Sequence, residues 1–172
     1  MDVFINDFLR FIHKDDEIEK AIVYNRDGQV LFSIRNGTAN EVEFDKDEFD
    51  QMKGTILVHS HVDNGDLTDK LLSGADMDTA AEYQLHLVIA VTKHSVSAFS
   101  PGSLLPGNHN KRDEFIEEYE QLFENGKASL EKINNEIEKT EIITKLAKEM
   151  SDYLKETEKR FGHKYYEWGV FE

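Results

Sequence analysis

Hydrophobic residues in the first hundred positions fall mainly into short continuous runs, which is the pattern of β-strands buried on both faces. Two runs, Glu19–Tyr24 and Gln29–Ile34, flank an Asp27-Gly28 pair. An Asp-Gly pair between two apolar runs predicts a β-hairpin. Further runs predict strands at residues 41–44, 55–59, 85–91 and 95–100.

Helical spacing of apolar residues interrupts these runs at three places. It predicts a short amphipathic helix over residues 2–13. Asp45 predicts the start of a second helix, over residues 47–52. Ser73, followed three residues later by Asp76, has the pattern of a capping box and predicts a helix through residue 84.

The pattern changes after the two Pro-Gly pairs at residues 101–102 and 106–107. From Lys111 onward, apolar residues follow two helical stripes. The first contains Phe115, Ile116, Tyr119, Leu122 and Phe123, and the second Leu130, Ile133, Ile137, Ile143, Ala147, Met150, Leu154 and Phe161. Strands followed by helices predict an α+β fold with a C-terminal helical hairpin. We expect a domain over residues 1–105 and an extension over residues 106–172.

Two interpretations of this helical extension remain open. The hairpin folds on itself or on the sheet, or its apolar stripe forms a seam for self-association or partner docking. A break in the apolar spacing near residues 140–143 argues against a long uninterrupted coiled coil. The aromatic-rich end, GHKYYEWGVFE, is expected to pack back onto the rest of the chain.

Charge and composition narrow the classes of function. The formal net charge is −15 and no basic stripe is present, so binding to nucleic acid or to an anionic membrane surface is disfavoured. The chain has no cysteine, so a metal site would use imidazole and carboxylate ligands. Absence of cysteine, of a signal-peptide pattern and of a long apolar run leads us to expect a cytoplasmic protein.

His59 and His61 follow directly from the apolar run at residues 56–58. Residues i and i+2 of a strand point to one face, so the two imidazoles project together. Such a pair suits zinc, and Asp76 on the next helix is the best candidate for a third ligand. Three protein ligands leave one position for the water that a catalytic zinc activates.

Alternatives to a metal site also fit these residues. A His-x-His pair occurs by chance, and the acidic segment after it reads by default as a solvated loop. Asp63, Asn64, Asp66 and Asp69 could suggest calcium, but the glycine and the final glutamate of a calcium-binding loop are not at the required positions. The other histidines are expected to be structural: His86 in the core or at a sheet edge, and His94 in a turn. His13, His109 and His163 have no partner at ligand spacing.

The order of these motifs resembles the JAMM (MPN/JAB) metalloprotease family, especially JAB-like domains of phages and mobile elements. The resemblance covers roughly residues 15–101. It rests on Glu19 opening the hairpin, His59-Ser60-His61, Ser73-Gly74-Ala75-Asp76 and a strand ending Ala90-Val91-Thr92. It implies an MPN/JAB-like, cytidine-deaminase-like mixed sheet flanked by helices.

The resemblance also implies roles for individual residues. His59, His61 and Asp76 would bind Zn²⁺, Glu19 would be the general base, and Ser73 would stabilise the oxyanion. The implied activity is that of a zinc-dependent peptidase or isopeptidase acting on a protein or peptide, including ubiquitin-like conjugates. Glu17 is the alternative base, and Asp78 is a fallback for Asp76 without the serine spacing.

Two departures from the family pattern keep a second function open. Val62 stands where the family usually has proline, and the segment from His61 to Ser73 is longer than usual. Some family members keep the fold without the metal. The alternative is therefore a non-catalytic MPN-like interaction module or a phage assembly component.

Overall fold

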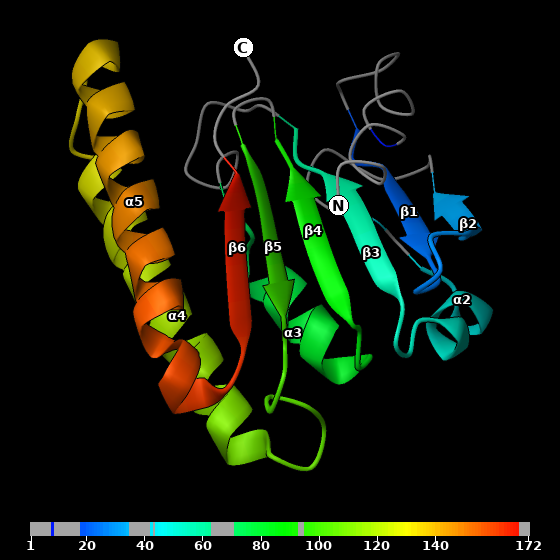
Figure 1. The fold of residues 1–172 in the computed structure, drawn as a ribbon. Coiled ribbons are helices and arrows are strands. Elements are labelled where there is room, and N and C mark those ends of the chain that lie inside the picture. Colours follow the sequence, from blue (N-terminus) through cyan, green and yellow to red (C-terminus); the bar gives the residue numbers. More distant parts are fainter. Residues whose placement is uncertain are drawn as a thin grey trace.

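Six strands form one mixed sheet in the order β2-β1-β3-β4-β5-β6 (Figure 1). The computed structural model describes residues 8, 18–34, 42, 44–62, 71–92 and 95–168. β3 and β4 pair in parallel and all other neighbours are antiparallel. The strands are β1 (Ala21–Tyr24), β2 (Val30–Ile34), β3 (Ile56–Ser60), β4 (Leu87–Val91), β5 (Val96–Ser100) and β6 (Lys164–Trp168).

Four helices of the described residues pack on one face of this sheet (Figure 1). They are α2 (Lys46–Gln51), α3 (Gly74–Glu82), α4 (His109–Leu130) and α5 (Glu136–Phe161). The expected α+β class is therefore confirmed, with a mixed sheet flanked by helices and a C-terminal helical hairpin.

The central strands are buried on both faces, which explains their continuous apolar runs. Alternate residues of these strands face two separate cores. Val23 and Leu57, for example, join the core that contains α3, α4 and α5. Tyr24 and Val58 join the opposite core, which includes Phe8.

α3 connects the parallel strands β3 and β4, because parallel neighbours need a crossover segment. The helix therefore begins beside the carboxyl end of β3. β1 runs antiparallel to β3, so the first residues of β1 lie at that same end of the sheet. Three segments that are distant in sequence thus meet at one edge.

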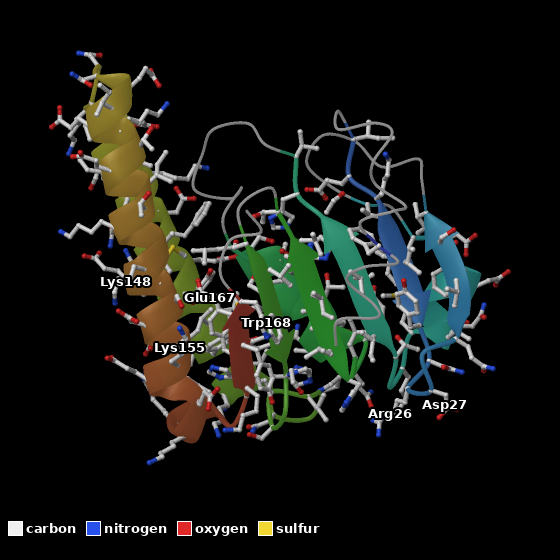
Figure 2. The ribbon with its side chains drawn as sticks, turned by 45° about the horizontal axis from the view of Figure 1, so that its top comes forward. Arg26, Asp27, Lys148, Lys155, Glu167 and Trp168 are labelled. Atoms are coloured by element: carbon white, nitrogen blue, oxygen red, sulfur yellow. The ribbon has the colours of Figure 1, made fainter. Side chains whose placement is uncertain are left out.

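The C-terminal segment completes the sheet as β6, which pairs with β5 along its length. Hydrogen bonds join β6 to α5: Glu167, for example, accepts from Ser151 at 2.7 Å and from Lys155 at 3.0 Å (Figure 2). The aromatic-rich end therefore packs back onto the chain as expected. The division into residues 1–105 and 106–172 stays a prediction, although both parts contribute to one hydrophobic core.

Several local expectations need correction. Val42 and Phe44 are not in a strand, and Glu41 and Glu43 lie outside the described residues. Leu130 belongs to α4 rather than to the next helix, and Ile137 is 74% exposed instead of buried, because it lies in the first turn of α5. Of the expected helix over residues 2–13, only Phe8 is described, and it is helical.

The helices of the described part of the chain were compared with the length and hydropathy that a membrane span requires. None of the helices there is both long enough and apolar enough to cross a bilayer.

Candidate metal centre

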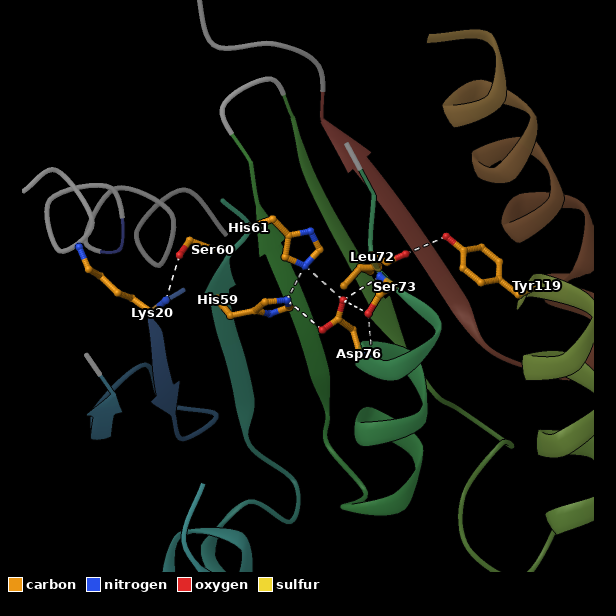
Figure 3. A network of polar contacts seen from close by, with 8 residues as sticks. All are labelled: Lys20, His59, Ser60, His61, Leu72, Ser73, Asp76 and Tyr119. Carbon is orange, nitrogen blue, oxygen red and sulfur yellow. Dashed lines mark hydrogen bonds and ion pairs between the residues drawn. The ribbon is translucent and has the colours of Figure 1, made fainter. Parts of the chain in front are cut away.

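The carboxyl end of β3 and the first turn of α3 bring two histidines and an aspartate together (Figure 3). His59 is in β3 and His61 follows it, and both project toward α3, as their spacing predicts. Asp76 is the third residue of α3. The sequence prediction that these three residues cluster is confirmed, and the group could hold a metal ion.

The three side chains converge on one another at short range. The Nε2 atoms of His59 and His61 are 3.0 Å apart. Asp76 approaches His59 Nε2 with Oδ1 at 3.0 Å and His61 Nε2 with Oδ2 at 3.3 Å. Ligands about 2.0–2.1 Å from a tetrahedral zinc ion lie about 3.3 Å from each other. The distance between the two Nε2 atoms is close to this spacing, and the histidines contact different oxygens of the Asp76 carboxylate.

Hydrogen bonds alone do not account for these three contacts. Each Nε2 atom offers either one proton or one lone pair, and a neutral imidazole carries only one proton. The two Nε2 atoms cannot both donate to Asp76 and also bond to each other. A shared cation would satisfy both lone pairs and the carboxylate at once, so the chemistry of this donor set fits a divalent metal.

Electrostatics keep Asp76 ionised. Burial alone would raise its pKa, but the charges and hydrogen bonds of His59 and His61 outweigh burial and hold the pKa well below its usual range. The Asp76 side chain is 19% exposed, against 5% for His59 and 7% for His61. Asp76 would therefore offer a metal ion an anionic ligand on the more open side of the group.

Ser73 holds the Asp76 carboxylate in place. It is the N-cap of α3, where its hydroxyl accepts a hydrogen bond from the Asp76 N–H at 3.1 Å. The same hydroxyl donates to Asp76 Oδ2 at 2.8 Å, and the Ser73 N–H donates to that oxygen at 2.7 Å. The expected capping box is confirmed. Its serine proton points to the candidate ligand.

Glu19 lies at the same edge of the sheet, immediately before β1. Ala21 pairs with His59. In the next position the Ser60 N–H donates to the Lys20 carbonyl at 3.0 Å, and the Lys20 N–H donates to the Ser60 hydroxyl at 3.0 Å (Figure 3). If this register continued for two residues beyond β1, Glu19 would lie opposite His61, on the face of the two histidines. Glu19 is 9% exposed. Glu17, the alternative base, is outside the described residues.

One feature of the histidines departs from a fully supported metal site. Ligand histidines usually donate their second ring nitrogen to a partner. His59 Nδ1 is buried and has no hydrogen-bond partner within the described part of the chain. The orientation of His59 therefore depends on packing in β3 and on Asp76.

The other expectations about titratable residues are settled in part. His86 precedes β4 and is exposed, so it is neither a core residue nor a member of the metal group. Asp78 forms an ion pair with Arg112 at 3.1 Å instead of replacing Asp76. The acidic segment that was expected to be a solvated loop, with Asp63, Asn64, Asp66 and Asp69, lies outside the described residues, as do His13 and His94.

Sequence reasoning missed how α4 supports this edge of the sheet. The buried Tyr119 hydroxyl donates to the Leu72 carbonyl at 2.7 Å, one residue before the α3 cap (Figure 3). Tyr119 lies on the predicted apolar stripe of the helix. The stripe predicts that the Tyr119 side chain is buried, but it cannot predict that its hydroxyl bonds to the Leu72 carbonyl, 47 residues away.

Comparisons with protein-family models, with curated proteins and with solved structures gave no match for this chain.

Proposed function

We propose that this protein is a zinc-dependent hydrolase of amide bonds, a peptidase or isopeptidase of the JAMM type. The observation that carries this proposal is the convergence of His59 Nε2, His61 Nε2 and the Asp76 carboxylate at 3.0–3.3 Å. These ligand types suit zinc, and three ligands from the protein are typical of catalytic rather than structural zinc sites.

Each residue of the group has a defined task in this mechanism. When bound, zinc would act as a Lewis acid that makes water nucleophilic near neutral pH. Glu19 would accept a proton from the attacking water and pass it to the leaving amine. Ser73 orients Asp76, and it would donate to the developing oxyanion only after its hydroxyl turns away from Asp76 Oδ2.

The order of the motifs along the chain supports the same proposal. Glu19, His59, His61, Ser73 and Asp76 follow the JAMM order. A mixed sheet with helices on one face is compatible with an MPN/JAB-like fold. The substrate would be a protein or peptide, including a conjugate joined through a lysine side chain.

The metal is tested first. Purified protein should retain zinc after dialysis, at about one equivalent per chain. Elemental analysis should find little zinc in the His59→Ala variant, and the exposed His86→Ala serves as the matched control because it removes an imidazole outside the group. Zinc missing from the parent protein, or equally retained by His59→Ala, would contradict the proposed site.

Glu19 is tested separately from the metal. Glu19→Gln should keep its zinc and lose hydrolysis of a peptide library by at least about a hundredfold, the scale of general-base catalysis. The product peptides would be counted by mass spectrometry. A Glu17→Gln variant is the matched control, and loss of activity in that variant alone would transfer the role of base to Glu17.

A non-catalytic role remains the second candidate. The observation in its favour is that the Ser73 hydroxyl is engaged by Asp76 at both its donor and its acceptor positions. In that case the metal group would stabilise an interaction module. Zinc binding without hydrolysis of peptides or of isopeptide-linked conjugates would favour this function.

A further inference from the structure

A groove opens between the first turn of α3 and the middle of α4. It is lined by Ser73, Gly74, Ala75, Glu120, Phe123 and Glu124 and has a volume of about 320 Å³. Pockets for whole ligands span roughly 300–1,000 Å³. The groove is at the small end of this range, so it suits one side chain of a larger substrate.

The groove and the candidate metal centre meet at Ser73. Ser73 lines the groove, and its hydroxyl is 2.8 Å from Asp76 Oδ2. The Tyr119–Leu72 hydrogen bond fixes α4 against the segment that leads to Ser73. A peptide whose amide bond lies at His59, His61 and Asp76 would therefore have a neighbouring side chain within reach of the groove.

Gly74 allows a carboxylate to form one wall. A Cβ atom at Gly74 would lie 3.0 Å from both Cγ and Oε1 of Glu120. Any larger residue at position 74 would push the Glu120 side chain away. The glycine thus keeps Glu120 directly over the first turn of α3.

The lining chemistry favours a cation. Within the described part of the chain, Glu120 and Glu124 have no ion-pair partner. The half-buried Phe123 adds an aromatic ring to the two carboxylates. Lys127 already places its ammonium 5.2 Å from the centroid of this ring. A carboxylate pair beside an aromatic ring is suited to an ammonium or guanidinium group.

We propose that this groove selects substrates with a lysine or arginine residue next to the amide bond held at the metal centre. The inference rests on the proposed function, because it assigns a substrate preference to that site. It follows from charge complementarity and from the position of Ser73, which lines the groove and contacts Asp76. The selective part is supplied by α4, which lies beyond the segment that resembles the JAMM family.

The charge of Lys127 should act on the binding of a basic peptide in the opposite direction to the charges of Glu120 and Glu124. The Lys127 ammonium lies 5.2 Å from the centroid of the Phe123 ring, so it would compete with a substrate cation and repel it. Removing the Lys127 charge should strengthen binding of a basic peptide. Removing the Glu120 or Glu124 charge should weaken binding of the same peptide.

The experiment uses the zinc-loaded full chain and three fluorescent hexapeptides that differ only in one central residue, lysine, norleucine or glutamate. Dissociation constants are measured by fluorescence anisotropy at low salt. Mass spectrometry checks each peptide afterwards, and where a peptide is cleaved the ratio of kcat/KM values replaces the ratio of dissociation constants. Norleucine keeps the aliphatic chain of lysine without its charge.

We expect the lysine peptide to bind best. Glu120→Gln and Glu124→Gln should each weaken its binding about two- to fivefold, the scale of an exposed charge pair, and leave the norleucine peptide unchanged. Lys127→Gln should strengthen binding of the lysine peptide by a similar factor. Higher salt should reduce all of these differences.

Glu141→Gln is the matched control, because Glu141 is exposed on α5, does not line the groove and changes the net charge equally. Equal binding of the lysine and norleucine peptides would refute the proposal that the groove selects a basic side chain. An effect of Glu141→Gln equal to that of Glu120→Gln would refute it as well. Hydrolysis without a basic preference would refute the groove and keep the proposed function. If the protein preferred the lysine peptide in a Glu120-dependent way but neither bound zinc nor hydrolysed peptides, the groove would be supported and the proposed function refuted.

Discussion

At the scale of single residues, the candidate metal centre depends on how Asp76 is shared between the helix cap and the two histidines. Its carboxylate faces both histidines, yet Oδ2 also accepts two hydrogen bonds from Ser73. One oxygen is thus held by the helix cap while the other contacts His59. Because the cap fixes the carboxylate, the first turn of α3 must be formed for Asp76 to hold this position beside the two histidines.

This coupling leads to a prediction for Ser73→Ala. The change removes the cap and one hydrogen bond to Asp76, so we expect unfolding free energy to fall by about 0.5–2 kcal/mol. Zinc affinity should fall about ten- to a hundredfold, as for other residues that support a metal ligand. Denaturant titration and competition with a zinc chelator measure the two effects.

Ser73→Gly is the matched control for this prediction. Glycine is tolerated as an N-cap at a cost of only a few tenths of a kcal/mol. It should restore most of the stability but not the zinc affinity. If both variants kept the zinc affinity of the parent protein, the Ser73 hydroxyl would not contribute to metal binding.

The residue pattern predicted His59, His61 and Asp76 because their placement follows from local geometry. Alternation in a strand places the two histidines on one face, and the capping box places Asp76 in the first turn of a helix. The position of Glu19 follows instead from pairing between β1 and β3, which are about 40 residues apart. Its role as the base is therefore still a prediction.

At the scale of elements, α4 is the part that links the C-terminal extension to the metal centre. Its Arg112 pairs with Asp78 and Glu82 of α3, and Tyr119 bonds to Leu72. Burial raises the pKa of Tyr119 well above its usual range, so its hydroxyl remains a neutral donor. Arg112 thus holds α4 against the C-terminal half of α3, and Tyr119 holds it against the segment just before α3.

We expect Tyr119→Phe to reduce the unfolding free energy by about 1–3 kcal/mol, because it leaves the buried Leu72 carbonyl without its donor. Urea denaturation measures the change. Tyr153→Phe is the matched control, since the Tyr153 hydroxyl donates to Glu118 at a half-exposed position. Its cost should be smaller. Equal costs would mean that the Tyr119 bond does not support α4 more than an ordinary surface contact.

At the scale of the whole molecule, the pattern of apolar residues predicted most elements, but it predicted no strand after the helical hairpin. Only one of the five residues of Lys164–Trp168 is buried. The segment therefore lacks the continuous apolar run by which the central strands were predicted. Its pairing with β5 joins segments more than 60 residues apart. Register of that kind depends on tertiary packing rather than on local sequence. His163, at the turn into β6, was therefore not recognised as a core residue.

His163 gives the whole fold a predictable sensitivity to acid. It is fully buried between α5 and β6, where Nε2 lies 2.8 Å from the Leu154 carbonyl and the ring packs on Phe99 and Phe115. Burial lowers the His163 pKa below the usual value of 6.5, although the Leu154 bond and Glu158 oppose this shift. The unfolded chain therefore binds a proton more readily than the folded protein does.

Linkage sets the direction of the effect. The stability contributed by neutral His163 is complete above pH 6.5 and is lost as the pH falls from there toward the lower pKa of the folded state. The slope from this residue should not exceed about 1.4 kcal/mol per pH unit. Unfolding free energies measured between pH 7.5 and about 5, above the ordinary carboxylate range, would record it.

His163→Gln is the decisive comparison, because glutamine supplies an amide donor and does not titrate in this range. The variant should be less stable than the parent protein near pH 7.5, and the difference should shrink as the pH falls. The other histidines are present in both proteins, so their contributions cancel in that difference. A difference that stayed constant across the range would show that His163 is protonated equally in the folded and unfolded states. Acid would then act on this fold through other groups.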